Sequence, residues 1–169
     1  GGSLMPVPGV GPQPALGMVI GEAPGKDEMR QGRPFIGPAG RMLDTALHAL
    51  GVVRDQLYIT NVVKEMPTTA EGHIRRPYEQ ETEAWWPILQ GEIENTAPLA
   101  ILCLGRCAIE TVTLKLYDVP GGNLPFGSKV GIVYAAWHPA FLLHGGGGKG
   151  RFENWIAQLN PWAEALPRP

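Results

Sequence analysis

The stretch MVIGEAPG, residues 18–25, decides the fold prediction because a short apolar run passes directly into a turn rich in Gly and Pro. Three more short apolar runs follow along the chain, at residues 57–59, 99–104 and 130–136. They are rich in β-branched or aromatic residues and show little alternation, which is typical of strands buried on both faces of a sheet. The four runs therefore predict a mostly parallel central sheet.

Helix-like segments separate the apolar runs. Their apolar residues recur at helical spacing, in residues 40–50, 79–96, 106–117 and 151–166. Pro87 lies inside the second segment, which is therefore predicted to be either a kinked helix or two shorter pieces. Strands that alternate with helices predict the α/β class, here a three-layer α/β/α sandwich with a short, mostly parallel central sheet.

Length and composition indicate one domain. The chain has 169 residues, 44% of them hydrophobic, which is enough for a single sizeable core. Residues 1–14 are rich in Gly and Pro and predict an irregular lead-in, whose first residues, Gly1-Gly2-Ser3, resemble a cloning remnant. We therefore expect one domain over residues 15–169.

Charge and cysteine usage exclude several classes of protein. A net charge of −2 excludes a histone-like polycation, so any nucleic-acid partner would have to meet a local basic patch. Cys103 and Cys107 are the only cysteines, too few for a disulfide framework or a four-thiolate cluster, and indicate an intracellular, cytoplasmic protein. No apolar run approaches the length of a membrane span, about 20 residues, so no membrane partner is expected.

Polar side chains follow three of the four predicted strands. Glu22 comes after the first, Asn61 after the second and His138 after the fourth. In open α/β sheets, ligands bind at the carboxyl ends of the strands. The sequence therefore predicts a site where these three side chains meet.

The segments around these residues carry motifs that resemble the uracil-DNA glycosylase superfamily, and its family 4 type in particular. The motifs are GEAPG at residues 21–25, followed by Glu28; GRPFIGPAG at 32–40; ITNVVK at 59–64; and HPA at 138–140, followed by Leu142 and Leu143. This resemblance covers most of residues 18–143. It implies the α/β/α fold of that superfamily and an enzyme that flips uracil, or a related 5-substituted pyrimidine, out of DNA and hydrolyses its N-glycosidic bond.

The resemblance also implies roles for individual residues. Phe35 would stack on the flipped base, and Asn61 would read the base through one acceptor and two donors. His138 would donate to the uracil O2 as the bond breaks, and Glu22 would support the positively charged sugar and orient water. The alternative for Phe35 is a ring in the core, and for Asn61 a turn residue. The alternative for His138 is a structural histidine, and for Glu22 a loop carboxylate. The implied substrate-binding set is Gly21, Ala23, Pro24, Gly25, Phe35 and Asn61.

The chain differs from family 1 in its first motif, where it is like family 4, and from family 4 in its cysteines. Ala23 and Gly25 stand where the family 1 motif has a water-activating aspartate and a tyrosine that blocks the thymine methyl group, so a larger 5-substituent is admissible. The four cysteines that hold an iron–sulfur cluster in family 4 are also missing. Glu65 and residues 84–87 occupy two of their expected places. We therefore expect no metal and no cofactor.

Basic and apolar residues near the motifs predict a DNA interface. Basic side chains suit phosphate contacts, and a leucine suits a wedge that enters the duplex where the base leaves. The glycine-rich run at 145–150 lacks the Walker A pattern and is expected to let the chain approach DNA. The predicted DNA-binding set is Arg33, Lys64, Arg75, Arg76, Leu142, Leu143, Lys149 and Arg151.

The sequence is also compatible with other functions. A monomeric, monofunctional glycosylase that leaves an abasic site is the first prediction, and an inactive uracil-DNA binding protein of the same fold is the second. A small-molecule nucleotide enzyme is disfavoured because no phosphate-binding fingerprint is present. Residues 71–77 are faintly similar to the KRRIH loop of a branch that traps uracil covalently, but His73 precedes the arginines here.

Overall fold

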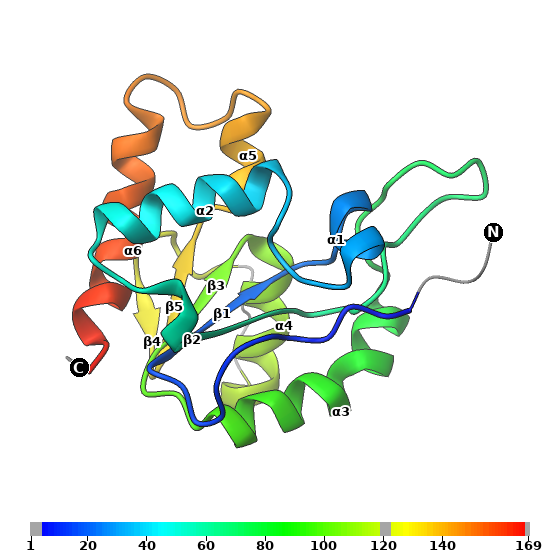
Figure 1. Cartoon of the computed structure of the whole chain (residues 1–169), viewed down its shortest axis with the longest axis horizontal. Helices are drawn as coiled ribbons and strands as arrows, with labels where there is room; N and C mark the ends of the chain where they lie inside the picture. Colours follow the sequence, from blue (N-terminus) through cyan, green and yellow to red (C-terminus); the bar gives the residue numbers. More distant parts are fainter. Residues whose placement is uncertain (1–4, 119–122, 168–169) are drawn as a thin grey trace.

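A five-stranded sheet in the order β2-β1-β3-β5-β4 forms the centre of the molecule (Figure 1). The computed structural model describes residues 5–118 and 123–167. The strands are β1 (Gly17–Gly21), β2 (Leu57–Asn61), β3 (Ile101–Leu104), β4 (Lys129–Val130) and β5 (Val133–Ala136). The first three and β5 are parallel, and only the two-residue edge strand β4 is antiparallel. The predicted α/β class with a mostly parallel sheet is confirmed.

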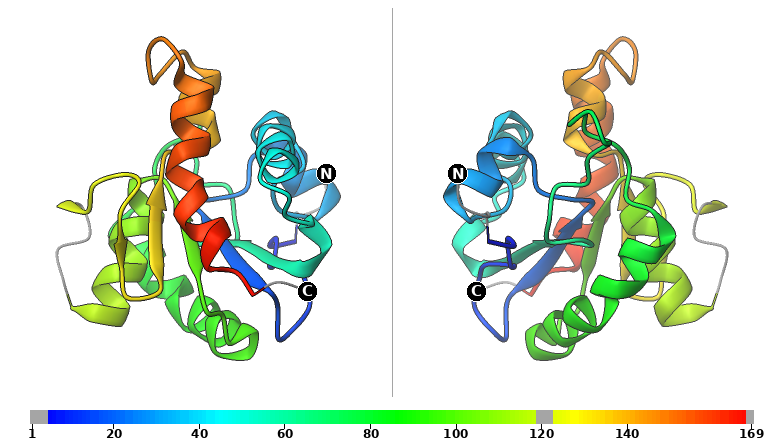
Figure 2. Two further views of the ribbon diagram at one scale, coloured as in Figure 1. Left: turned by 90° about the vertical axis from the view of Figure 1, so that its left-hand side faces the viewer. Right: turned by 90° about the vertical axis from the view of Figure 1, so that its right-hand side faces the viewer.

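Helices cover both faces of the sheet, as the two side views in Figure 2 show. The described helices are α1 (Lys26–Gln31), α2 (Pro38–Ala49), the 3₁₀ turn η1 (Arg54–Gln56), α3 (Glu79–Thr96), α4 (Arg106–Tyr117), α5 (Pro139–Leu143) and α6 (Arg151–Ala165). The sequence pattern predicted α2, α3, α4 and α6 to within two residues. It missed α1 and α5, which are too short to show helical periodicity.

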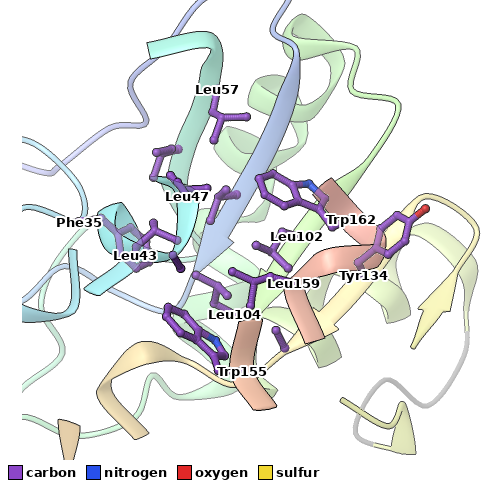
Figure 3. Close-up of a cluster of buried hydrophobic side chains, with 14 of the residues drawn as sticks. Phe35, Leu43, Leu47, Leu57, Leu102, Leu104, Tyr134, Trp155, Leu159 and Trp162 are labelled. Atoms are coloured by element: carbon purple, nitrogen blue, oxygen red, sulfur yellow. The ribbon is translucent and has the colours of Figure 1, made fainter. Parts of the chain in front are cut away.

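Alternate residues of β1, β2, β3 and β5 pack into two separate cores. Val19 and Leu102 face the core under α2 and α6, which Trp155 and Trp162 of α6 fill (Figure 3). Met18 belongs to the opposite core, under α3 and α4. Because both faces of the strands are covered, they contain no polar alternation, and this is why the sequence shows continuous apolar runs.

The structure corrects one predicted strand and decides between the two alternatives for the segment around Pro87. Residues 130–136 are not one strand, because Gly131 has a φ of 60° and turns the chain between β4 and β5. Few residues with a side chain tolerate that left-handed conformation, whereas glycine does. Pro87 lies inside a single helix, α3, so that segment is not two pieces.

The lead-in is tied to the sheet within its described part. Val7 is buried, and its N–H donates to the Lys64 carbonyl. Val10 forms an antiparallel bridge with Ile59 of β2. Residues 1–4, including Gly1-Gly2-Ser3, lie outside the described residues. Of the helices in the described ranges, none has the length and apolar character needed to cross a membrane.

Candidate active site

The carboxyl ends of β1 and β2 lie side by side, because Gly21 pairs with Asn61 in the parallel register. Gly21 has no side chain, and the space beside it is occupied. A Cβ placed there would lie 2.4 Å from the Phe35 ring and 2.6 Å from Asn61 Oδ1. Only glycine therefore lets the aromatic ring and the amide approach the strand end together.

Asn61 has an unsatisfied acceptor in the interior. The residue is 2% exposed, and its Oδ1 lacks a hydrogen-bond partner. Within residues 5–118 and 123–167, only one other buried side-chain atom, Thr96 Oγ1, shares this property. A buried acceptor without a partner costs free energy, about 1–3 kcal/mol. A ligand that donates a hydrogen bond to this oxygen would remove that cost.

Phe35 is held in a strained backbone conformation. Its φ is 53°, a region that bulky L-residues rarely adopt. The Arg54 guanidinium donates to the Phe35 carbonyl at 2.8 Å and to the Pro34 carbonyl at 2.9 Å. Gly40 leaves room for the same Phe35 carbonyl, which would lie 1.9 Å from a Cβ at that position. These contacts keep the Phe35 ring beside Gly21.

Glu28 joins the two loops of the first motif. Its carboxylate accepts hydrogen bonds from the backbone N–H groups of Gly25, Ile36 and Gly37, at 3.0, 2.9 and 2.7 Å. The sequence assigns Glu28 no role, although its place three residues after Gly25 matches the acidic half of a capping box, the half that a glycine N-cap can still form. Arg54 was missed entirely, and no local pattern signals its contacts 19 and 20 residues away.

His138 begins α5 with its ring directed back onto the helix start. Its Nδ1 accepts a hydrogen bond from the Ala140 N–H at 3.0 Å. In the neutral ring the proton therefore sits on Nε2, which is left as a donor. Burial lowers the pKa of His138 from 6.5 to about 4, although Glu28 opposes the shift. The Phe35 and His138 ring centroids lie 5.8 Å apart.

Glu22 lies on a cavity of about 690 Å³ that also reaches His138. Burial raises the pKa of the Glu22 carboxyl above its ordinary value, and the charge of Arg76 partly offsets this. Ala23 lines the same cavity, but Phe35 and Asn61 do not. The structure therefore brings Glu22 and His138 together at an open cavity, with Phe35 and Asn61 in the interior beside Gly21.

Lys64 is not available to DNA, contrary to the sequence-based prediction. It is 1% exposed and its ammonium lies 2.6 Å from the Glu92 carboxylate of α3. It also donates to Thr60 Oγ1 at 2.8 Å and to the backbone carbonyl of Asn61. Burial lowers its pKa, and the Glu92 carboxylate opposes that shift. Lys64 therefore supports the strand end that carries Asn61.

Of the two leucines predicted to form a wedge, Leu142 is buried and only Leu143 is exposed. Leu142 is 2% exposed and belongs to the core beneath α2 and α6, so it cannot enter a duplex from this structure. Its neighbours Phe141 and Leu143 are 46% and 43% exposed. A five-residue helix must bury one side, and α5 packs Leu142 inward because it lies on α2.

The basic residues of the predicted DNA-binding set differ in whether their side chains are engaged within the chain or exposed. Arg75 pairs with Glu81 at 2.6 Å and its guanidinium lies 3.7 Å from the Tyr78 ring centroid, so it is already engaged within the chain. Arg76 lines the Glu22–His138 cavity. The remaining members of the set are exposed, namely Arg33, Lys149 and Arg151. His73 is also exposed and does not line that cavity.

The glycine-rich run packs on aromatic rings. A Cβ at Gly146 would lie 2.4 Å from the Phe141 ring, and one at Gly147 would lie 3.1 Å from the Trp137 ring. Gly145 and Gly148, by contrast, have nothing within 4 Å of the same position. Two of the four consecutive glycines therefore allow the loop to contact the protein itself.

The cysteines do not fit an iron–sulfur cluster. Cys103 lies in β3 and Cys107 in α4, both buried among apolar side chains. Burial raises the pKa of both thiols, that of Cys107 to about 12, whereas metal ligation needs thiolates. In the described part of the chain, no three His, Cys, Asp or Glu side chains form a group able to hold a metal ion.

Comparison with known proteins agrees with the motifs. The profile of the uracil DNA glycosylase superfamily matches residues 8–162. A type-4 uracil-DNA glycosylase of Archaeoglobus fulgidus is 37% identical over 152 residues, which is 82% of this chain and 72% of the relative. Those of Sulfurisphaera tokodaii and Pyrobaculum aerophilum are 37% and 36% identical, over 82% and 90% of this chain and 66% and 81% of the relatives.

The matched region contains every motif on which the resemblance rested, from GEAPG at residues 21–25 to HPA at residues 138–140. The same segments end β1, end β2 and begin α5, so the candidate site lies inside the matched region. The profile covers far more than half of the chain. The chain belongs to the uracil-DNA glycosylase superfamily.

Proposed function

We propose that the protein is a monofunctional DNA glycosylase that hydrolyses the N-glycosidic bond of uracil, or of a related 5-substituted pyrimidine, in DNA. The observation that carries the proposal is the buried, unpartnered Oδ1 of Asn61 beside the Phe35 ring. An acceptor of this kind fits the N3–H of uracil, and the Asn61 amide nitrogen fits the O4. The type-4 relatives carry the name uracil-DNA glycosylase, which supports this substrate.

The chemistry assigned to His138 is stabilisation of the departing base. The bond between N1 of uracil and C1′ breaks with its electron pair going to the base, and negative charge gathers on O2. The Nε2–H of neutral His138 donates to that oxygen, because Nδ1 is occupied by the Ala140 N–H. A neutral donor also leaves the base as an anion, which takes up a proton after it departs.

Glu22 is assigned to the sugar side of the reaction. The sugar carries positive charge while the bond to the base stretches, and a water oxygen then bonds to C1′ and passes one proton to the Glu22 carboxylate. A carboxylate at the cavity wall stabilises that charge and orients the water. The raised pKa of Glu22 brings it closer to that of an effective general base.

Fewer residues are assigned to DNA contacts than the sequence predicts. Arg76 at the cavity and the exposed side chains of Arg33, Lys149 and Arg151 contact phosphates. Leu143, exposed on α5, is the remaining leucine for a wedge. Ala23 and Gly25 present little bulk, which favours tolerance of a 5-substituent on the base.

The direct test uses a labelled oligonucleotide that contains one uracil. Incubation with the protein followed by alkali should cleave the strand at that position, because an abasic site is alkali-labile. A matched oligonucleotide with cytosine at the same position should stay intact. If the protein binds the uracil strand but never produces an abasic site, the alternative of an inactive binding protein replaces this proposal. The absence of an aspartate at Ala23 is the observation that favours that alternative.

Asn61→Asp should weaken uracil excision. A carboxylate cannot donate to O4 and repels the negative charge that develops on the base, so we expect a loss of about 1–3 kcal/mol in transition-state stabilisation. Single-turnover rates of both proteins measure it. Asn95→Asp, the same change at an exposed position of α3, is the matched control. Equal rates for Asn61→Asp and the parent would remove Asn61 as the base reader.

The purified protein should be colourless and free of iron. Neither cysteine stands at a cluster position, and both thiols are buried with raised pKa values. Metal analysis, acid-labile sulfide and the visible absorption spectrum check this expectation. Stoichiometric iron and sulfide would contradict it.

A further inference from the structure

Three aromatic rings follow one another along the wall of the Glu22–His138 cavity. Phe126, Trp137 and Phe141 all line it. The ring centroids of Phe126 and Trp137 are 6.3 Å apart, and those of Trp137 and Phe141 are 5.3 Å apart. Their planes are inclined by 64° and 53°, so the rings do not stack face to face on one another. The base-excision chemistry described above uses none of them.

Hydrogen bonds fix the backbone of Trp137, and glycines of the neighbouring loop pack against the Trp137 and Phe141 rings. The backbone N–H of Trp137 donates to Gln158 Oε1, and its carbonyl accepts from Trp155 Nε1, both at 2.9 Å. Gly147 packs close to the Trp137 ring, and Gly146 packs close to the Phe141 ring. Rings that are fixed before binding lose little conformational entropy when a ligand stacks on them.

The charge of the wall favours a polyanion. Arg76 and Arg106 line the cavity, and the Arg106 guanidinium lies 5.5 Å from the Phe126 ring centroid. Glu22, the residue assigned to the reaction, is the one carboxylate among the described lining residues. Aromatic rings next to guanidinium groups are the combination that binds single-stranded nucleic acid, because bases stack on the rings while cations follow the phosphates.

We propose that Phe126, Trp137 and Phe141 form a stacking track for unpaired bases that flank the excised nucleotide, which makes single-stranded DNA the preferred substrate. In a duplex, neighbouring base pairs cover the faces of each base, so only an unpaired strand offers faces to this track. The volume of about 690 Å³ belongs to the size class of sites that hold molecules much larger than one pyrimidine. The proposal rests on the proposed function for its location beside the reacting base.

The test measures DNA binding without uracil. Fluorescence anisotropy gives the Kd for a labelled short oligothymidine, both single-stranded and annealed to its complement. Phe141→Ala should raise the single-strand Kd by about tenfold or more, since stacking contributes roughly 1–3 kcal/mol per base and 1.4 kcal/mol is tenfold. The duplex Kd should change by less than about twofold. Phe141→Tyr should retain parental affinity, as should the exposed control Ile88→Ala on α3.

Phe126→Ala is a second, independent variant with the same expectation, and thermal melting checks that each variant is folded. Single-strand affinity that stays within about twofold in both alanine variants, or that falls equally for the duplex, would overturn the track. Excision of uracil is assayed in parallel on the parent. A parent that lacks excision but shows the selective loss of single-strand affinity would disprove the proposed function and leave the track standing.

Discussion

Glu92→Ala should lower the free energy of unfolding by about 3–5 kcal/mol, the range for breaking a buried ion pair by removing one partner. The Lys64 ammonium is 2.6 Å from the Glu92 carboxylate, and both side chains are almost fully buried, at 2% and 9% exposure. Without Glu92 the ammonium keeps only Thr60 Oγ1 and the Asn61 carbonyl as acceptors. The same carboxylate also accepts from the Tyr58 hydroxyl and the Gly9 N–H, which would lose their partner as well.

Urea unfolding of the parent and the variant measures this change. The matched control is Glu83→Ala, which removes the exposed partner of Lys115 and should cost less than about 1 kcal/mol. A double variant, Glu92→Leu with Lys64→Met, should recover much of the lost stability because no buried charge is left unpaired. If Glu92→Ala lowers the free energy of unfolding no more than Glu83→Ala does, the Lys64–Glu92 pair does not stabilise the end of β2.

His138→Ala should slow single-turnover excision of uracil by about 10²–10³, the cost of removing one donor aimed at a developing oxyanion. Negative charge appears on O2 only as the glycosidic bond stretches, so the donor contributes more in the transition state than in the ground state. Affinity for uracil-containing DNA should therefore change far less than the rate. His48→Ala, at an exposed position of α2, is the control. An active parent with an unimpaired His138→Ala variant would remove this histidine from the mechanism.

The protonation state of His138 gives the same prediction a second readout. Burial lowers its pKa from 6.5 to about 4; the charge of Glu28 opposes this shift and that of His144 adds to it. NMR of the imidazole should show a neutral ring as pH falls through 6.5, with titration only near 4. Because the unfolded chain binds this proton first, the free energy of unfolding should fall as pH drops across that window. A histidine that titrates near 6.5 would contradict the neutral-donor mechanism.

The positions of the candidate site residues in the fold were largely predictable because these residues follow strands. An apolar run that ends in a Gly/Pro turn marks a strand end, and parallel strands bring such ends to one edge. This reasoning predicts Glu22, Asn61 and His138 as site residues, and the structure places Glu22 and His138 on one cavity and Asn61 in the interior. Phe35 was identified through its motif, whereas its positive φ and its hold by Arg54 depend on a residue 19 positions away.

Lys64 and Leu142 show what local reasoning cannot reach. A lysine after a strand resembles a phosphate ligand, but its partner Glu92 lies 28 residues away on α3. A leucine after the HPA motif resembles a wedge, but the side that α5 buries depends on α2, far along the chain. Charge and apolarity are properties of one residue, whereas burial is a property of the neighbours that the fold supplies.

The sequence by itself determined the α/β class, the order of the main helices and strands, the family and the residue types at the site. Each of these depends on short-range periodicity or on the identity of a few consecutive residues. Only the tertiary structure decided which acceptor lacks a partner, which basic residue is neutralised in the core, and that three separate aromatic residues line one cavity. The reason is that these properties arise from contacts between segments distant in sequence, and no local pattern records such contacts.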